Sequence, residues 1–284
     1  MTSSSETQKL VVVTGASTGM GAATARSLAA RGFHVLAGVR RDPVGAPGIE
    51  PVLLDITDPE HVEALAARVA ADPRPLHAVV NNAGIQVNAP VEALPLPEWR
   101  HVFEVNLFGH VAVTQALLPA LLRTGGRVVN ISSIGGKAAM PTYGAYAGAK
   151  FALEAVSDAL RREVEPLGVR VVVVEPGGVR TEMATRGIAT ANDLAARMSP
   201  EQDQRYGGLV QAINSLMASG TSSGVTAEAA GEAIAKVVTA RRPRTRYTVG
   251  RDAAVLTRLT RILSDRTLDR VIGTTVRRHY PKAA

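Results

Sequence analysis

Short runs of β-branched residues alternate along the chain with longer segments whose apolar residues recur every three or four positions. The short runs are typical of strands buried on both faces, and the longer segments are typical of amphipathic helices. The predicted strands cover residues 9–14, 34–39, 51–54, 78–81, 127–131 and 169–175, and 246–249 is a further candidate. The predicted helices cover residues 21–31, 58–71, 98–108, 110–123, 146–165 and 226–240. Because strand and helix alternate at short spacing, we expect an α/β fold with a doubly wound parallel sheet and helices on both faces.

Two late segments depart from this alternation. Residues 181–224 have no strong period and are rich in Ala, Ser, Gly and Met, which favours a lid inserted after the sixth strand. Residues 251–284 predict a basic helical tail whose apolar positions are Val255, Leu256, Leu259, Ile262 and Leu263. Since no internal repeat or disordered linker interrupts the chain, we expect one domain over residues 1–284 with its core at 9–250.

The composition is that of a globular protein with a full core, because 46% of the 284 residues are hydrophobic and 20% are charged. There is no cysteine, which excludes disulfides, thiolate metal sites and thiolate nucleophiles. The first residues, MTSSSETQ, carry no secretory-signal pattern. The longest aliphatic runs reach about five residues, against the roughly 20 that span a bilayer. We therefore expect a cytoplasmic protein without an integral membrane segment.

The formal net charge of +7 is concentrated near the end of the chain. From Arg241 onward there are 12 Lys and Arg residues and 3 Asp and Glu residues, whereas the first 240 residues hold 20 and 22. This distribution argues against a uniformly basic surface that binds nucleic acid. For the tail, packing of its Leu and Ile stripe against the protein or a second subunit is favoured over weak peripheral binding to an anionic membrane.

A glycine-rich turn follows the first predicted strand and opens the first predicted helix. Its glycines are Gly15, Gly19 and Gly21, in a spacing one residue longer than the usual GxGxxG fingerprint of Rossmann-like domains. Glycine lets the backbone turn sharply and approach a pyrophosphate, whose charge is favoured by the free N–H groups and the dipole of the helix. The alternative is a tight turn that binds nothing.

The same turn contains GxSxG, the nucleophile elbow of serine hydrolases, at residues 15–19. That interpretation requires Ser17 to follow a central strand and to meet an acid and a histidine. Here the turn follows the first strand, and the six histidines, at residues 34, 61, 77, 101, 110 and 279, have no distinguishing sequence context. The hydrolase interpretation is therefore disfavoured.

Further motifs follow the glycine turn in a fixed order. They are Asn81-Asn82-Ala83-Gly84, Asn106, Asn130-Ile131-Ser132-Ser133, Tyr146-Ala147-Gly148-Ala149-Lys150 and, after the sixth predicted strand, Pro176-Gly177-Gly178-Val179-Arg180-Thr181. In order and spacing, these motifs together with the glycine turn resemble the short-chain dehydrogenase/reductase family over residues 9–240. The resemblance implies a Rossmann-like fold and an oxidoreductase that uses a nicotinamide cofactor.

The stretch YGAYAGAK offers two tyrosines, of which only Tyr146 has a lysine, Lys150, four residues later on the same helix face. Tyr146 also lies 13 residues after Ser133, the separation found in the family, so Ser133 is favoured over Ser132. The resemblance implies that Tyr146 is the general acid or base, that Ser133 holds the substrate oxygen, and that Lys150 also binds the nicotinamide ribose. The other tyrosine, Tyr143, is expected to be a pocket wall or a packing residue.

A phenol with a reference pKa near 10 is a poor base at neutral pH. Lowering its pKa by about three units requires roughly 4 kcal/mol of preferential phenolate stabilisation, which we expect from the cationic Lys150 and the oxidised nicotinamide. Asn106 has two interpretations. The family uses this position to hold a water in a proton relay to the lysine, and a hydrogen bond at a helix bend is the alternative.

Val39 and Arg40 stand where the second predicted strand ends. An NAD site places Asp or Glu at this point to bind the ribose 2′-hydroxyl, whereas an arginine suits the 2′-phosphate of NADP. We therefore expect NADP(H) to be preferred over NAD(H); the alternative is that Arg40 and Arg41 are solvated charges and either form is used. By resemblance, the other cofactor-binding residues are Gly15, Ser17, Thr18, Gly19, Met20, Gly21, Asp55, Ile56, Asn82, Ala83, Gly84, Tyr146, Lys150, Pro176, Gly177, Val179 and Thr181. No metal is expected.

The stretches EPGGVRTEM and ARRPRTRYTVG resemble the branch of 17β-hydroxysteroid and retinol dehydrogenases, which implies a lipophilic secondary alcohol or ketone as substrate. The expected lid offers an apolar wall of Met183, Met198, Leu209, Ile213, Leu216 and Met217. The family also implies a homodimer or a homotetramer. The alternative function is a catalytically silent, cofactor-sensing regulator of the same fold, which the complete set of Asn106, Ser133, Tyr146 and Lys150 argues against.

Overall fold

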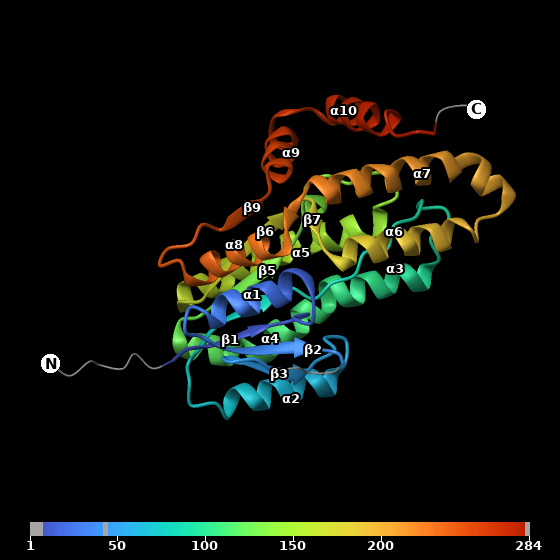
Figure 1. Cartoon of the computed structure of the whole chain (residues 1–284). Helices are drawn as coiled ribbons and strands as arrows, with labels where there is room; N and C mark the ends of the chain where they lie inside the picture. The colour runs from blue at the N-terminus through green and yellow to red at the C-terminus, as the bar shows by residue number, and fades with distance from the viewer. Residues whose placement is uncertain (1–7, 42–44, 282–284) are drawn as a thin grey trace.

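The computed structural model describes residues 8–41 and 45–281, and a seven-stranded parallel sheet lies at its centre (Figure 1). The polar start of the chain therefore lies almost wholly outside the described residues. The strands are β1 (Leu10–Val13), β2 (His34–Val39), β3 (Ile49–Leu53), β4 (Leu76–Asn81), β5 (Arg127–Ile131), β6 (Arg170–Pro176) and β9 (Arg246–Val249). They lie in the order β3-β2-β1-β4-β5-β6-β9, and all neighbours are parallel. The predicted doubly wound fold is confirmed, and its chain order reverses between β1 and β4, where such folds form a crevice.

Helices cover both faces of this sheet. They include α1 (Gly19–Ala29), α2 (Pro59–Ala70), α4 (Gly109–Thr124), α5 (Gly144–Val164) and α8 (Ala227–Thr239). On one face α1 and α8 bury Leu28 and Ile234, and on the other α2 and α4 bury Leu65 and Leu117. The strands are apolar on both sides because both sides are covered, and all four residues of β1 are buried.

Several elements begin earlier than their patterns predict. Helix α1 begins at Gly19 rather than residue 21, and α5 begins at Gly144 rather than residue 146. Glycine and alanine give almost no apolar period, so the first turns of these helices leave no signal. Strand β3 begins at Ile49 rather than residue 51 and contains Pro51, which is tolerated because β3 is an edge strand.

The two helices predicted at 98–108 and 110–123 form one continuous helical stretch. It consists of α3 (Leu96–Phe103), the π-helical turn η1 (Glu104–Phe108) and α4. Among the described residues, this stretch is the one helix that is long and apolar enough to cross a membrane by length and composition. Half of its most apolar window is buried inside the protein, and Val102 and Val113 are fully buried. Its apolar character is therefore that of a core helix.

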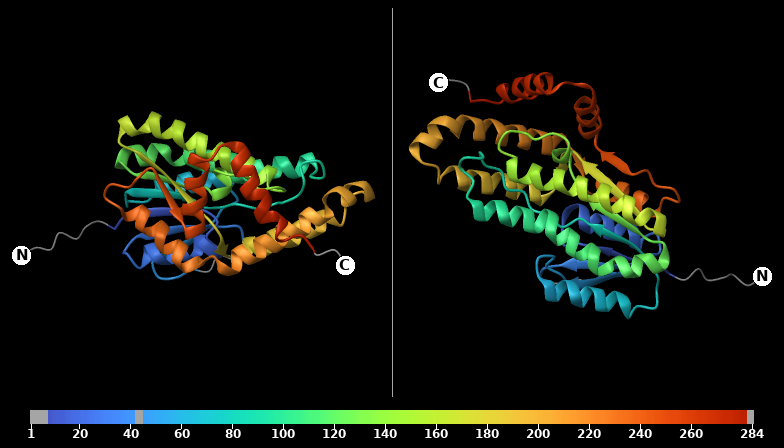
Figure 2. Two further views of the ribbon diagram at one scale, coloured as in Figure 1. Left: turned by 90° about the horizontal axis from the view of Figure 1, so that it is seen from above. Right: turned by 180° about the vertical axis from the view of Figure 1, so that it is seen from behind.

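The segment 181–224 is a helical hairpin rather than an irregular insert. Helix α6 (Glu182–Ala195) is followed by α7 (Pro200–Ser223), which begins with a capping box at Ser199 and Gln202. A two-stranded ladder of β7 (Val179–Arg180) and β8 (Val225–Thr226) joins the two ends of the hairpin. Figures 1 and 2 show both helices extending beyond the sheet. The sequence pattern did not predict these helices, because many small and polar residues in α7 interrupt the three-to-four-residue spacing of its apolar residues.

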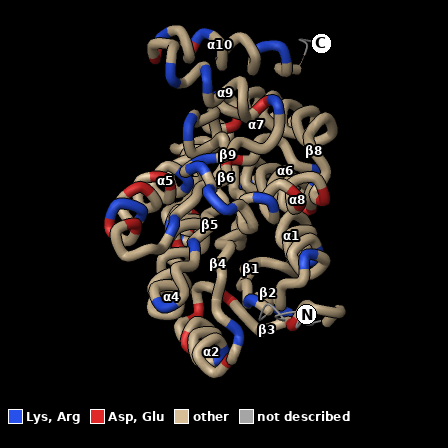
Figure 3. Tube along the Cα trace, turned by 90° about the vertical axis from the view of Figure 1, so that its left-hand side faces the viewer, with Lys and Arg blue, Asp and Glu red and all other residues tan. Residues whose placement is uncertain are grey.

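The predicted tail contains α9 (Arg251–Ile262) and α10 (Asp265–Arg277). Helix α10 lies over α7 (Figure 2). There, Ile272 and Val276 pack in one cluster with Ile213 and Met217 of α7. The tail therefore packs against the protein through α10, whereas Val255 and Ile262 of the expected Leu and Ile stripe are exposed on α9. The arginines of α9 and α10 are exposed, and Figure 3 marks their positions along the trace in blue.

Candidate active site

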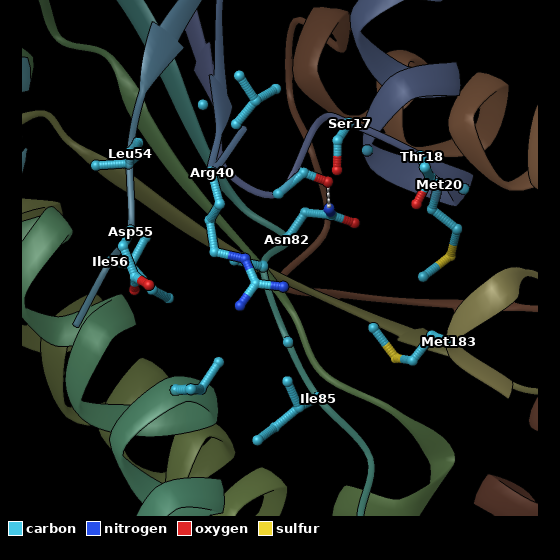
Figure 4. A pocket seen from close by; sticks show the side chains of 18 of the residues that line it. Ser17, Thr18, Met20, Arg40, Leu54, Asp55, Ile56, Asn82, Ile85 and Met183 are labelled. Atoms are coloured by element: carbon cyan, nitrogen blue, oxygen red, sulfur yellow. Dashed lines mark hydrogen bonds between the residues drawn. The ribbon is translucent and has the colours of Figure 1, made fainter. Parts of the chain in front are cut away.

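A cleft opens at the carboxyl ends of β1, β2 and β4, where the strand order reverses (Figure 4). Most of the predicted cofactor-binding residues line it: Gly15, Ser17, Thr18, Gly19, Met20, Gly21, Arg40, Asp55, Ile56, Asn82, Ala83, Gly84 and Thr181. Leu54, Ile85, Val105, Met183 and Arg186 also line it and were not predicted to bind the cofactor. Five predicted cofactor-binding residues are not among the lining residues: Tyr146 and Lys150 of α5, and Pro176, Gly177 and Val179, which lie where β6 ends and β7 begins.

The glycine turn lies so close to other backbone atoms that its glycines cannot be replaced by residues with a side chain. Gly15 and Gly19 have φ angles of +63° and +56°, a region that L-residues with side chains rarely adopt. A Cβ atom on Gly15 would lie 2.7 Å from Ala83 Cα, and one on Gly21 would lie 2.2 Å from the Gly15 carbonyl oxygen. The turn is thus pressed against the segment that follows β4, and all three glycines are required.

Thr14 and Asn82 hold the glycine turn to the end of β4. Thr14 Oγ1 accepts hydrogen bonds from the backbone N–H groups of Asn82 (2.9 Å) and Ala83 (3.0 Å). Asn82 Nδ2 donates to the carbonyl oxygens of Thr14 (2.9 Å) and Gly15 (3.1 Å), and Figure 4 shows the bond that links Asn82 to the turn. Sequence reasoning passed over Thr14, whose only signal is a hydroxyl at the end of an otherwise apolar strand.

Arg40 and Asp55 face the cleft from the ends of β2 and β3. The guanidinium of Arg40 extends into the cleft (Figure 4). The Asp55 carboxylate accepts hydrogen bonds from the backbone N–H (3.0 Å) and the hydroxyl (2.7 Å) of Thr57. Although burial acts to raise it, the pKa of Asp55 is held below its usual value by these hydrogen bonds and by the charge of Arg40. The cleft is thus lined by a carboxylate, Asp55, and a guanidinium, Arg40, that interact electrostatically.

These residues fit a nicotinamide dinucleotide. The glycine turn is a backbone cradle that a Cβ atom would fill. Thr18, the N-cap of α1, makes no side-chain capping hydrogen bond, so the first N–H groups of the helix are left for phosphate oxygens. Arg40 would suit a ribose 2′-phosphate, and Asp55 with Ile56 would border the adenine.

Lys150 is buried, and its ammonium group points at the main chain. Its Nζ donates a 2.9 Å hydrogen bond to the carbonyl oxygen of Ile131, the last residue of β5. Burial lowers the pKa of Lys150 to about 8, and the negative charge of Glu154 acts in the opposite direction. Lys150 therefore loses its proton more easily than a lysine in water, because burial disfavours the charged form.

Ser133 and Tyr146 meet across the turn after β5. A Cβ atom on Gly135 would lie 3.1 Å from Tyr146 Cε1 and 3.4 Å from Ser133 Oγ. Ser133 Oγ accepts a 3.0 Å hydrogen bond from the Gly135 N–H and so caps the short helix η2 (Ile134–Gly136). Ser132 is buried instead, and its hydroxyl has no hydrogen-bond partner among the described residues. The structure therefore brings Ser133, rather than Ser132, to the tyrosine.

The pKa of Tyr146 is raised in the protein alone, not lowered. Burial of the phenol raises it, and the hydroxyl of Ser133 only partly opposes this effect. In the chain by itself, Lys150 is not among the groups that lower the pKa of Tyr146. The reason is geometric, since the ammonium group is directed to Ile131 while the phenol is desolvated. The expected lowering by Lys150 together with the oxidised nicotinamide stays a prediction.

Tyr143 packs against the ring of Tyr146. The two rings are nearly perpendicular, with centroids 6.1 Å apart, the edge-to-face arrangement that aromatic pairs favour. Burial raises the pKa of Tyr143 far above its usual value. Thr142, just before it, is the one non-glycine among the described residues with a positive φ, at +68°. This rare conformation turns the chain into α5 and was not foreseen.

Asn106 lies in the π-helical turn η1 and is fully buried. Its Oδ1 accepts from the Ile85 N–H (3.0 Å), and its Nδ2 donates to the Ile85 carbonyl oxygen (2.8 Å). The side chain therefore fixes the segment after β4, instead of bonding to its own helix as the helix-bend alternative requires. Insertions of this π type are frequent at functional sites.

His110 is a site residue that the sequence interpretation missed. It is buried one turn after Asn106, and its Nε2 lies 2.6 Å from the carbonyl oxygen of Ala83 in the cleft wall. Burial, and then the charge of Lys150, lower the pKa of His110 to about 3, so the ring is neutral and Nε2 donates the hydrogen bond. A polar residue four positions after Asn106 in an apolar helix was the available signal.

The chain was compared with known proteins. Residues 9–191 match the protein family described as short chain dehydrogenase. Dehydrogenase/reductase SDR family member 9 of Bos taurus is 34% identical over 261 residues, which cover 87% of this chain and 82% of that protein. Retinol dehydrogenase 5 of Homo sapiens is 37% identical over 267 residues, with coverages of 87% and 82%. A solved short chain dehydrogenase from Burkholderia cenocepacia J2315, in complex with NADP, has a TM-score of 0.73 and 26% identity, and covers 94% of this chain and 98% of that one.

Proposed function

The chain belongs to the short-chain dehydrogenase family, and on that premise we propose that it transfers hydride between NADP(H) and a lipophilic secondary alcohol or ketone. Oxidoreduction with a nicotinamide cofactor follows from the family itself. The observation that carries the finer proposal is the meeting of Ser133 and Tyr146 beside the buried Lys150, next to a cleft that contains Arg40.

The proton transfer is assigned to Tyr146. A bound nicotinamide would supply the hydride acceptor or donor. Because burial raises the pKa of Tyr146, the phenol is protonated at neutral pH and is ready to act as a general acid toward a ketone oxygen. Ser133 would hold that oxygen by a hydrogen bond. In the direction of alcohol oxidation, the same phenol needs positive charge nearby to act as a base, and Lys150 is the protein group able to contribute it.

The preference for NADP(H) rests on Arg40. Strand β2 ends at Val39, whose apolar side chain cannot bind a free ribose 2′-hydroxyl. Arg40 extends into the cleft instead and would pair with a 2′-phosphate. The Burkholderia relative was solved with NADP, which agrees with this preference.

The substrate is proposed to be lipophilic because an apolar cluster includes Tyr143, whose ring packs against that of Tyr146. It joins Met140 and Tyr143 to Ile188, Leu209, Ile213, Leu216 and Met217 of the helical hairpin. Of the apolar wall expected from the sequence, Met183 instead lines the dinucleotide cleft, and Met198 is not part of this cluster. One relative is named a retinol dehydrogenase, a name that is consistent with a substrate of this class.

The proposal is tested by replacing Tyr146 with Phe and following the absorbance of NADPH over a panel of steroid, retinoid and simpler ketones. We expect the variant to lose activity by at least about 10²-fold, the usual contribution of a positioned general acid. The matched control is Tyr143→Phe, which removes a hydroxyl from the same short stretch and should retain activity within about tenfold, because Tyr143 has no proton to transfer in this mechanism.

Binding of NADPH, measured by its fluorescence in both variants, separates loss of chemistry from loss of the cofactor. Full activity of Tyr146→Phe would refute the assignment of the proton transfer. Tight NADPH binding by the wild-type chain with no turnover of any substrate in the panel would instead favour the silent, cofactor-sensing regulator.

A further inference from the structure

A buried ionic cluster lies one helical turn beyond Lys150. It consists of Glu154, Glu175, Lys137 and Arg246. Tyr146, Lys150 and Glu154 are spaced four residues apart on α5, so their side chains share one helix face. The side chains of Glu154 and Glu175 are 6% and 1% exposed. Buried carboxylates are costly unless they are paired, so a cluster at this position calls for an explanation.

Each cation of the cluster binds both carboxylates. Lys137 Nζ lies 2.7 Å from Glu154 Oε2 and 3.4 Å from Glu175 Oε1. Arg246 Nε lies 3.0 Å and 3.4 Å from the same two atoms, and its Nη2 also pairs with Asp158 at 2.9 Å. The other oxygen of Glu154, Oε1, is buried without a hydrogen-bond partner among the described residues. Glu154 is therefore fixed in place while half of its carboxylate remains unpaired.

The cluster joins the segments that carry the candidate catalytic residues. Lys137 follows the turn that Ser133 caps, and Glu175 stands just before Pro176 at the end of β6. Gly136 is packed between these parts. A Cβ atom on it would lie 2.8 Å from Ser132 Oγ and 3.2 Å from both Glu154 Cγ and the carbonyl oxygen of Lys150. The side chain of Glu154 and the backbone of Lys150 therefore both border Gly136.

The groups that face Lys150 come from two helices. Tyr146 and Glu154 lie on α5 itself, and His110 lies on α4. Tyr146 and His110 are neutral at pH 7, because burial raises the pKa of the phenol and lowers that of the imidazole to about 3. Among the described residues, Glu154 is the acid whose charge counteracts the effect of burial on the pKa of Lys150, which is about 8.

We propose that Glu154 is a positioning residue for the hydride transfer, because its fixed carboxylate keeps Lys150 in the ammonium form beside Tyr146. The inference rests on the proposed function, since the protonation of Lys150 matters for catalysis only if Tyr146 transfers the proton. Lys137 and Arg246 act through Glu154 by holding it. Glu175 shares both cations but belongs to β6, and it serves as the matched comparison.

The direct test is to titrate Lys150 in the protein without cofactor. The chain has five lysines, at residues 9, 137, 150, 236 and 282, so ¹³C labelling of the lysine Cε atoms gives a tractable NMR spectrum. The Lys150→Met variant assigns the signal. In Glu154→Gln we expect the midpoint of Lys150 to fall by about one pH unit, the lower end of the shift caused by a single close opposite charge. In Glu175→Gln the midpoint should stay near its wild-type value of about 8.

An unchanged midpoint in Glu154→Gln would overturn the proposal. Equal shifts in Glu154→Gln and Glu175→Gln would also overturn it, because they would assign the effect to the whole cluster. Glu154→Asp retains the charge and should restore most of the wild-type midpoint. If Glu154→Gln fails to fold by circular dichroism, the double variant Glu154→Gln/Lys137→Met removes one charge of each sign; its midpoint should fall below that of Lys137→Met alone, which is the reference for the loss of the cation.

The kinetic counterpart is the pH profile of kcat/KM. Loss of the Lys150 proton lowers the rate on the alkaline side, so this limb should move to lower pH in Glu154→Gln and stay in place in Glu175→Gln. A chain that turns over no substrate would contradict the proposed function, whereas the NMR titration would still decide the role of Glu154. A shifted midpoint with an unmoved alkaline limb would show that Lys150 does not govern the rate, and would overturn the catalytic part of the proposal.

Discussion

Arg40 and Arg41 are neighbours in the chain, yet only Arg40 enters the cleft (Figure 4). Arg40 is the first residue after β2, and its charge already acts on the carboxylate of Asp55. A single residue at a strand end can therefore set the local charge where a ribose would bind. This arrangement is the basis of the proposed pairing of Arg40 with a 2′-phosphate.

Replacing Arg40 with Ala should raise the Michaelis constant for NADPH by about tenfold or more and leave that for NADH almost unchanged. The reason is that a charge-assisted hydrogen bond contributes roughly 1.5–3 kcal/mol, and NADH has no 2′-phosphate to receive one. Steady-state kinetics with each cofactor at saturating substrate gives the two constants. Arg41→Ala is the matched control and should leave both unchanged. An unaltered NADPH/NADH ratio in Arg40→Ala would remove the proposed role of Arg40.

Helix α9 is connected to the site through its first turn. Asp252 Oδ2 accepts a 2.7 Å hydrogen bond from the N–H of Gly178 in the segment between β6 and β7. A Cβ atom on Gly177 would lie 2.1 Å from the same carboxylate oxygen, and one on Gly178 would lie 2.4 Å from the Gly220 carbonyl oxygen. These two glycines are therefore required by α9 and α7, whatever their contact with a cofactor.

Asp252→Ala should loosen this segment, which carries the predicted cofactor residues Pro176, Gly177, Val179 and Thr181. We expect the KM for NADPH to rise by about threefold to tenfold and the melting temperature to fall by a few degrees, because about 1 kcal/mol of hydrogen bonding is lost. Kinetics and thermal unfolding measure these effects. Asp265→Ala removes the corresponding acid in the first turn of α10 and should change neither quantity. Identical behaviour of the two variants would show that the Asp252 contact does not reach the site.

Four large apolar side chains are exposed on α4, on α5 and just before α4. Phe108, which precedes α4, is 54% exposed, and Phe151 of α5 is 45% exposed. Leu122 and Val156 on the same two helices are also exposed. Large apolar groups gathered on neighbouring elements are typical of protein–protein contact surfaces. We therefore propose that α4 and α5 form the contact surface of the homodimer or homotetramer that the family implies.

Phe151→Glu should weaken this association by at least about tenfold, because it places a charge where an apolar contact is buried. Light scattering coupled to size-exclusion chromatography, over a range of protein concentrations, measures the mass. Val255→Glu changes a 57% exposed residue on α9 and should leave the mass unchanged. A monomeric wild-type chain, or an unaltered mass for Phe151→Glu, would contradict the proposed interface.

Local spacing was enough to predict much of the molecule. The seven strands of the sheet show as short apolar runs, the glycine turn as closely spaced glycines, and the Tyr146–Lys150 pair as an interval of four residues. Each of these features depends on residues a few positions apart. The hairpin of α6 and α7 was the exception, because its small and polar residues weaken the helical period. Thr142 also escaped prediction, since threonine gives no local sign of a positive φ.

The sequence by itself therefore determined the fold and the identity of the candidate catalytic residues. The tertiary structure alone decided what surrounds them: Ile131 as the partner of Lys150, His110 against Ala83, and Glu154 beside Glu175. These contacts join positions that lie far apart in the chain or come from different elements, so no short pattern encodes them. The pKa values follow from the same cause, because the pKa of a phenol or an amine depends on how much water the packed neighbours exclude and on which charges they bring.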